Sequence, residues 1–194
     1  MIVTLTGGSG AGKSTIGEWL RKTFRARLKP VVSITTRRPR DTDPPGEYEY
    51  MSKEKFLETK RAGRFIWDVC PYGTDLYGTM YESLKAADDE PDAIFLMVLE
   101  LASVRKLHIH AKKVGLKIAS FYILSPSEKE LRRRLEKRKT DPAEMERRIE
   151  KSRQWDAWAL GSGVPYVFVR NDLDDDGQKA ASTIATEIIE RMSA

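Results

Sequence analysis

Residues 2–24 carry the feature that most constrains how this chain can fold. A short run rich in β-branched residues, 2–6, stops at a pair of glycines, and apolar residues at helical spacing follow at Ile16, Leu20 and Phe24. The intervening residues 7–14 match the pattern G-x-x-x-x-G-K-[ST]. Between a strand and a helix, this pattern predicts a loop whose backbone N–H groups surround phosphate oxygens. The alternative is a glycine-rich turn that only joins the two elements.

The chemistry of this loop predicts a site for ATP or GTP together with Mg²⁺. The start of the following helix adds about half a positive charge at the same point. We expect Lys13 to act in catalysis by reaching the β and γ phosphates, and the Ser14 hydroxyl to bind the metal. The expected nucleotide-binding residues are Gly8, Ser9, Gly10, Ala11, Gly12, Lys13, Ser14 and Thr15.

Buried strands and amphipathic helices alternate through much of the remaining chain. We expect strands at residues 30–34, 93–99, 117–124 and 166–169, and helices at 104–114 and about 178–192. This alternation is typical of a parallel sheet. We therefore predict an α/β fold of the P-loop NTPase type, with a five-stranded parallel sheet and helices on both faces.

Two additions to this core are expected. Residues 34–80 form the first, a small mixed α+β insertion that begins with a Pro-rich basic loop at 35–46. A helix follows from Ser52 to about residue 62. Antiparallel strands are expected at 65–69 and 76–77, around a turn at 72–75. Helical segments at 128–138 and 143–158 predict a charged hairpin, with a lid at about 136–148. The core then comprises residues 1–33 and 81–194.

Composition excludes several other classes of protein. The 194 residues are 40% hydrophobic and 32% charged, which is ordinary for a globular domain and argues against disorder, collagen and coiled coil. The single cysteine, Cys70, cannot form an internal disulfide, and the longest apolar run, 93–99, is too short to cross a bilayer. We expect a cytoplasmic protein without membrane contact. A net charge of +5 suits anionic ligands without requiring a nucleic acid.

A basic segment after the second expected strand carries a family resemblance. Residues 33–40 read Ser-x-T-T-R-x-P-R, Tyr48 and Tyr50 follow Gly46, and the run Tyr77-Gly78-Thr79 comes later. In this the sequence resembles the guanylate kinases, and the likeness extends to Asn171 at the end of the last strand. The resemblance implies that the acceptor monophosphate and its base are bound by Ser33, Arg37, Arg40, Tyr48, Tyr77 and Thr79. Tyr50 is the alternative to Tyr48, because the loop is a residue shorter than usual.

The same resemblance assigns roles to the hairpin and to the last strand. Arg134, Arg138 and Arg148 match the arginines that the family brings over the transferring phosphate, and Asn171 matches a position near the adenine. Charge on the γ phosphoryl group spreads over its oxygens during transfer, so such cations stabilise the transition state. Each of these binding roles has a structural alternative. The hairpin arginines then form only surface salt bridges, the basic loop around Arg37 is only solvated, and the tyrosines only pack the insertion.

Two departures from the family pattern bear on the substrate. Where guanylate kinases place Glu before Trp, this chain reads Trp67-Asp68, and we expect Asp68 to accept the N–H groups of guanine after a one-residue slip. If Asp68 points elsewhere, the choice of base is open. The family also shows Asp-x-Asp where this chain reads Val98-Leu99-Glu100. Glu100 can replace the second acid, whereas Val98 leaves the metal to Ser14 and the phosphates.

The sequence therefore predicts a nucleoside monophosphate kinase that transfers the γ phosphoryl group of ATP to GMP or dGMP, with Mg²⁺. The alternatives are a kinase of the same fold acting on another nucleotide or a sugar phosphate, and a non-catalytic module that binds a phosphorylated protein segment. Nucleic-acid binding is a weaker alternative. Both a monomer and a homodimer are compatible with the sequence.

Overall fold

The computed structural model describes residues 1–41, 43–70, 74–90, 92–171 and 177–193. Its central sheet has five strands in the order β2-β7-β1-β8-β9, all paired in parallel. The strands are β1 (Ile2–Gly7), β2 (Leu28–Pro30), β7 (Ile94–Val98), β8 (Ile118–Leu124) and β9 (Tyr166–Arg170). The predicted five-stranded parallel sheet is confirmed.

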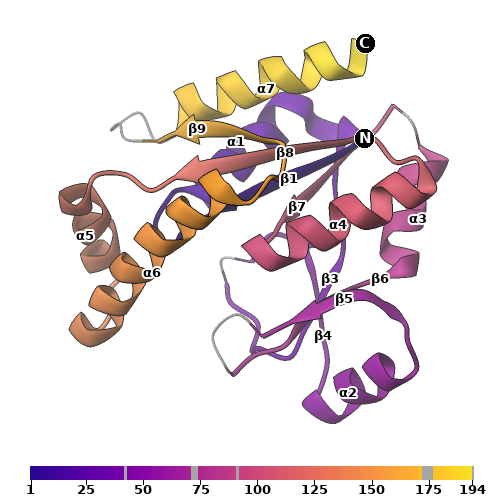
Figure 1. The fold of residues 1–194 in the computed structure, drawn as a ribbon, viewed down its shortest axis with the longest axis horizontal. Helices are drawn as coiled ribbons and strands as arrows, with labels where there is room; N and C mark the ends of the chain where they lie inside the picture. Colours follow the sequence, from indigo (N-terminus) through magenta and orange to yellow (C-terminus); the bar gives the residue numbers. More distant parts are fainter. Residues whose placement is uncertain (42, 71–73, 91, 172–176, 194) are drawn as a thin grey trace.

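Helices cover both faces of this sheet, as predicted (Figure 1). Alternate strand residues pack on one face against α1 (Lys13–Phe24) and α7 (Gln178–Ser193), where Leu5 and Phe121 meet Ile16 and Ile184. The opposite face packs against α3 (Tyr81–Asp89), α4 (Leu101–Val114) and the end of α6 (Pro142–Gly161). Because successive strand residues point to opposite faces and both faces are covered, most strand residues are apolar, with Thr4, Thr6 and Ser120 as buried polar exceptions.

A second, four-stranded sheet holds the insertion, in the order β4-β3-β6-β5. Its strands are β3 (Ser33–Thr35), β4 (Tyr48–Tyr50), β5 (Phe65–Val69) and β6 (Tyr77–Met80), and helix α2 (Lys53–Arg61) packs on it. Ser52 caps α2 by accepting the N–H of Lys55, as expected. The predicted antiparallel pairing of β5 with β6 is confirmed. Residues 71–73, which include part of the predicted turn, lie outside the described ranges.

The strand predicted at residues 30–34 was wrong, because two strands of different sheets share that segment. β2 pairs with β7 through Pro30↔Leu96, and β3 then pairs with β4 and β6 in the second sheet. Proline cannot donate to a ladder, which suits the end of edge strand β2. The sequence reading also missed β4 and α3. The short 3₁₀ helix η1 (Arg25–Arg27) joins α1 to β2.

The charged hairpin consists of α5 (Glu128–Lys137) and α6, and projects from one end of the central sheet (Figure 1). Its two helices share a small apolar core of Leu131, Leu135, Met145 and Ile149. The use of its tip, residues 136–148, as a lid stays a prediction, as do the domain boundaries at 34 and 80. Within the described ranges, no helix has both the length and the apolarity needed to cross a membrane.

Candidate active site

The loop between β1 and α1 leaves the start of α1 open to an anion. Gly12 is the N-cap of α1, so it offers no side chain to the first-turn N–H groups, and no acidic residue lies in that turn. By contrast, Ser52, Ser127 and Asp141 cap α2, α5 and α6 with side-chain oxygens. Uncapped N–H groups and the helix dipole together favour binding of a phosphate here.

Close packing explains why this loop is built of glycine. Gly10 and Gly12 have φ angles of 86° and 100°, a left-handed region that side chains rarely adopt. A Cβ on Gly10 would lie 2.4 Å from the Leu131 side chain of α5, and one on Gly12 would lie 2.0 Å from Asn171 Nδ2. The loop is therefore held directly against the hairpin and the end of β9.

Three side chains donate hydrogen bonds to carbonyl oxygens of the loop. Lys13 Nζ donates to the carbonyl oxygens of Gly7 and Gly8 at 2.7 and 2.9 Å. Arg134 donates to the Gly10 carbonyl at 3.2 Å, and Asn171 Nδ2 donates to the Ala11 carbonyl at 2.8 Å.

Cations gather around this loop. Burial, and to a smaller extent the positive charge of Arg138, lowers the pKa of Lys13 to about 8. The pKa of Arg138 is itself lowered by burial and then by Arg148 and Arg134. Arg148 also reaches the loop, donating to Ser9 Oγ at 3.2 Å. Mutual repulsion among these cations indicates a place that an anion would stabilise.

A cavity of about 510 Å³ opens on the hairpin side of the loop. Six residues predicted from the sequence line it: Gly10, Gly12, Thr15, Arg134, Arg138 and Asn171. The sequence reading missed Gly177 and three residues of α5 that also line it, Glu130, Arg133 and Lys137. The spacing of Arg133 and Lys137 along one helix was the available signal. Among the described residues that line this cavity, the four cations and the one acid suit a polyphosphate.

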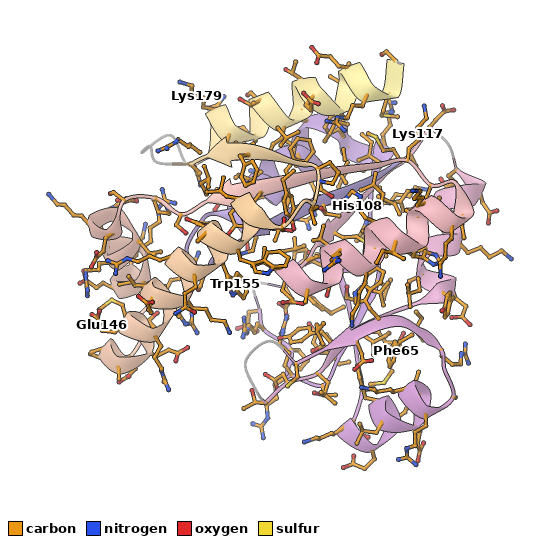
Figure 2. The ribbon with its side chains drawn as sticks, in the orientation of Figure 1. Phe65, His108, Lys117, Glu146, Trp155 and Lys179 are labelled. Carbon is orange, nitrogen blue, oxygen red and sulfur yellow. The ribbon has the colours of Figure 1, made fainter. Side chains whose placement is uncertain are left out.

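A second cavity, of about 250 Å³, lies between the loop and the insertion. The predicted residues that line it are Lys13, Ser33, Arg40, Tyr48, Tyr77, Thr79 and Glu100. The sequence reading missed Gly7, Trp67, Val69, Gly78, Val98, Leu99, Ser103 and Trp155. Trp155 points from α6 toward α4 (Figure 2). Elements far apart in the chain thus build one cavity beside Lys13.

Arg37 lies behind this cavity rather than in its wall. Its guanidinium donates to Asp43 Oδ2 at 2.8 Å and to Oδ1 at 2.6 Å, and the side chain is only 6% exposed. Asp43 Oδ2 also accepts the Arg40 N–H at 2.8 Å and the Tyr50 hydroxyl at 2.6 Å. Tyr50 is therefore engaged by Asp43, while Tyr48 lines the cavity. No local pattern marked Asp43 in the sequence.

Comparison with known proteins identifies the family of this chain. The family model described as guanylate kinase matches residues 1–187. The chain belongs to the guanylate kinase family. It is 31% identical to a guanylate kinase of Ruegeria pomeroyi, covering 99% of this chain and 88% of the relative. A guanylate kinase of Bifidobacterium longum is 32% identical, with 96% and 94% covered.

A solved structure supports the fold of this guanylate kinase-family chain. The crystal structure of guanylate kinase from Anaplasma phagocytophilum superposes with a TM-score of 0.71 and 19% identity, covering 100% of this chain and 86% of that one. At that identity the likeness supports the architecture alone.

The structure does not bring Asp68 into the acceptor cavity of this guanylate kinase-family chain. Its carboxylate instead pairs with Lys60 Nζ of α2 at 2.6 Å. The reason is a break in the register between Phe65 and Trp67, where β5 carries a bulge opposite β6. Trp67 therefore occupies the cavity face and Asp68 the opposite face. The expectation that Asp68 lies by the base has no support from this geometry.

The residues beside the loop fit a Mg²⁺ ion carried by a nucleotide. Ser14 is exposed in the first turn of α1, so its hydroxyl is open to a cation. Within the described part of the chain, no group of three or more His, Cys, Asp and Glu could hold a metal. Mg²⁺ commonly keeps several waters and takes few protein ligands besides substrate phosphates. Ser14 therefore suits a metal held mainly through phosphate oxygens.

Proposed function

We propose that the chain transfers the γ phosphoryl group of ATP to GMP or dGMP, giving ADP and GDP or dGDP. One observation carries this proposal: the two cavities lie on either side of the same glycine loop. Gly10 and Gly12 line the cavity beside the hairpin, while Gly7 and Lys13 line the cavity beside the insertion. A donor and an acceptor phosphate bound in the two cavities would meet at Lys13, as in-line transfer requires.

The donor side uses the glycine loop and the hairpin. Backbone N–H groups of residues 8–15 bind the phosphates of ATP, and Asn171 lies near the base. Lys13, Arg134, Arg138 and Arg148 stabilise the charge that spreads over the transferring group. Closure of the hairpin tip over the nucleotide would exclude water. When bound at Ser14, Mg²⁺ neutralises phosphate charge.

On the acceptor side, the reaction depends on positioning the acceptor phosphate rather than on removing a proton from it. Arg40, Tyr48 and Tyr77 hold the acceptor phosphate. Arg37 supports these residues from behind the cavity through its ion pair with Asp43. Ser33, Thr79 and Glu100 lie toward the base. A phosphate monoester has a second pKa of about 6, so it is largely ionised at neutral pH and attacks without a general base.

The same proposal places the reaction in the cytoplasm, with nucleotides as partners, no nucleic acid and no membrane. A single cysteine suits a reducing compartment. A monomer or a homodimer would both serve, because both cavities are built from one chain.

An acceptor screen tests the proposal. The protein is incubated with ATP and Mg²⁺ and, separately, with GMP, dGMP, AMP, CMP, UMP, dTMP or a sugar phosphate, and ADP release is measured. We expect turnover with GMP or dGMP that disappears in Lys13→Ala. Lys22→Ala is the matched control, since Lys22 lies on the same helix but is exposed and paired with Glu18. Turnover only with another acceptor would refute the proposal, as would ATP binding without any turnover.

A further inference from the structure

The bulge in β5 decides which side chains face the acceptor cavity. In the ladder with β6, Trp67 lies opposite Thr79 and Val69 lies opposite Tyr77. Residues directly opposite one another share a face of the sheet, and all four line the cavity. Asp68 lies opposite Gly78 and therefore faces the other way, toward α2.

An uninterrupted strand would have given the reverse arrangement. Phe65 faces α2, where its ring stacks on Phe56 with centroids 4.5 Å apart. Without the extra residue, strict alternation would place Trp67 beside Phe65 on that face and turn Asp68 into the cavity. The bulge thus exchanges a carboxylate for an indole ring in the cavity wall.

The exchange changes what this wall can recognise. An indole offers an N–H donor and two ring faces but no acceptor, so it cannot pair with the N1–H and amino groups of guanine. Among the described residues that line the cavity, Glu100 supplies the only carboxylate. Its Oε1 already accepts from the backbone N and the Oγ of Ser103, both at 3.2 Å. A flat aromatic ring can still bind the Trp67 wall by stacking.

We infer that Trp67 is a specificity-determining residue that contacts the base of the acceptor nucleotide through its ring face, and that Asp68 does not read the base. This inference rests on the proposed function, because it places the base of a nucleoside monophosphate in the acceptor cavity. Trp67 is buried and also packs within the core beneath α4, so conservative variants are needed to test it.

Equilibrium binding separates Trp67 from Asp68. The dissociation constant of GMP is measured by calorimetry without ATP for wild type, Trp67→Phe, Trp67→Leu and Asp68→Asn. We expect Trp67→Leu to weaken GMP binding roughly tenfold, Trp67→Phe to retain most of the affinity, and Asp68→Asn to bind within about twofold of wild type. A tenfold loss in Asp68→Asn, or none in Trp67→Leu, would overturn the inference.

Ribose 5-phosphate separates a contact with the base from general damage to the cavity. It carries the same phosphate as GMP but no base, so its inhibition constant against GMP should be equal in wild type and Trp67→Leu. An equal loss for both ligands would overturn the inference. If Trp67→Leu fails to fold, Trp67→Phe decides the question. GMP should quench indole fluorescence in wild type, and the quenching should be smaller in Trp67→Phe although GMP still binds, with Trp155 of the same cavity as a remaining indole. Equal quenching in the two proteins would overturn the inference.

The binding measurements test the role of Trp67 separately from the proposed phosphoryl transfer. A wild-type protein that phosphorylates GMP while the Trp67 variants bind it normally contradicts the inference alone. A wild-type protein that binds GMP through Trp67 but never phosphorylates it contradicts the proposed function alone.

Discussion

Arg37 and Asp43 form an ion pair through two hydrogen bonds, Nη1 to Oδ2 at 2.8 Å and Nη2 to Oδ1 at 2.6 Å. The ring of Tyr48 lies 4.6 Å from the guanidinium, so the pair supports a residue of the acceptor cavity. The same carboxylate binds the backbone of Arg40, a second cavity residue. The pair therefore shapes the acceptor loop from behind.

Replacing Asp43 should impair acceptor binding more than catalysis. In Asp43→Ala the Arg37 guanidinium loses its carboxylate partner while remaining buried, which should cost about 2 kcal/mol of stability. We expect the KM for GMP to rise at least about tenfold, with kcat and ATP affinity changed less, because Arg40 and Tyr48 lose their support. Steady-state kinetics and urea unfolding measure both effects. Asp41→Ala, at an exposed neighbour, is the control and should behave as wild type.

Acid should destabilise the protein partly through Asp43. Hydrogen bonds from Arg37 hold the pKa of Asp43 well below its usual range, against the opposing effect of burial. A carboxyl group whose pKa is lowered in the folded state stabilises the protein at pH values above its unfolded-state pKa of about 4. This stabilisation is lost as the pH falls below that value. The free energy of unfolding, measured from pH 7 to 3, should fall less in Asp43→Asn than in wild type. Equal slopes in the two proteins would contradict this assignment.

Nucleotide binding should weaken in alkali because of Lys13. With its pKa lowered to about 8, Lys13 in the free protein loses its proton as pH rises above that value. A polyphosphate prefers the protonated form, so its affinity should fall by up to about tenfold per pH unit above pH 8. Calorimetric titration of ATP from pH 7 to 10 tests this. Lys13→Arg, which stays charged, should bind less tightly but with a flat pH profile over the same range.

Two adjacent arginines of α6 should differ sharply in their effect on rate. Arg147 and Arg148 both pair with Glu144, at 2.7 and 2.8 Å, but the Arg147 side chain is 74% exposed whereas Arg148 reaches Ser9 of the glycine loop. We expect Arg148→Ala to lower kcat about a hundredfold or more, with GMP and ATP affinities within about threefold. Arg147→Ala should retain full activity. Single-turnover rates would decide, and similar losses in both variants would argue for a purely structural hairpin.

A methyl group on Gly10 should disrupt the loop. Gly10→Ala combines a left-handed φ of 86° with a contact of 2.4 Å to Leu131 Cδ1, so the loop or the Leu131 side chain must shift. We expect ATP affinity to fall at least about tenfold and the melting temperature to drop. Gly115→Ala is a matched control, since its φ is 77° but nothing lies within 4 Å of the added atom. It should cost about 1 kcal/mol of stability and leave ATP binding unchanged.

Features with a local cause were predictable from the sequence. The glycine loop, its flanking strand and helix, the cap at Ser52 and the amphipathic hairpin each depend on residues close together in the chain. Buried apolar runs alternating with helices were also enough to predict the central parallel sheet. Most of the residues expected in the two cavities line them, because the ends of parallel strands gather at one edge of a sheet.

Features with a distant cause were not predictable. Residues 30–34 divide between two sheets because β7 and β6 lie where they do, and the paired role of Arg37 depends on how the loop folds back to Asp43. For the wall of the acceptor cavity, the sequence alone shows that Trp67 and Asp68 are neighbours in β5. Only the pairing with β6 decided which of the two faces the cavity, because one bulged residue reverses the alternation of every side chain that follows it.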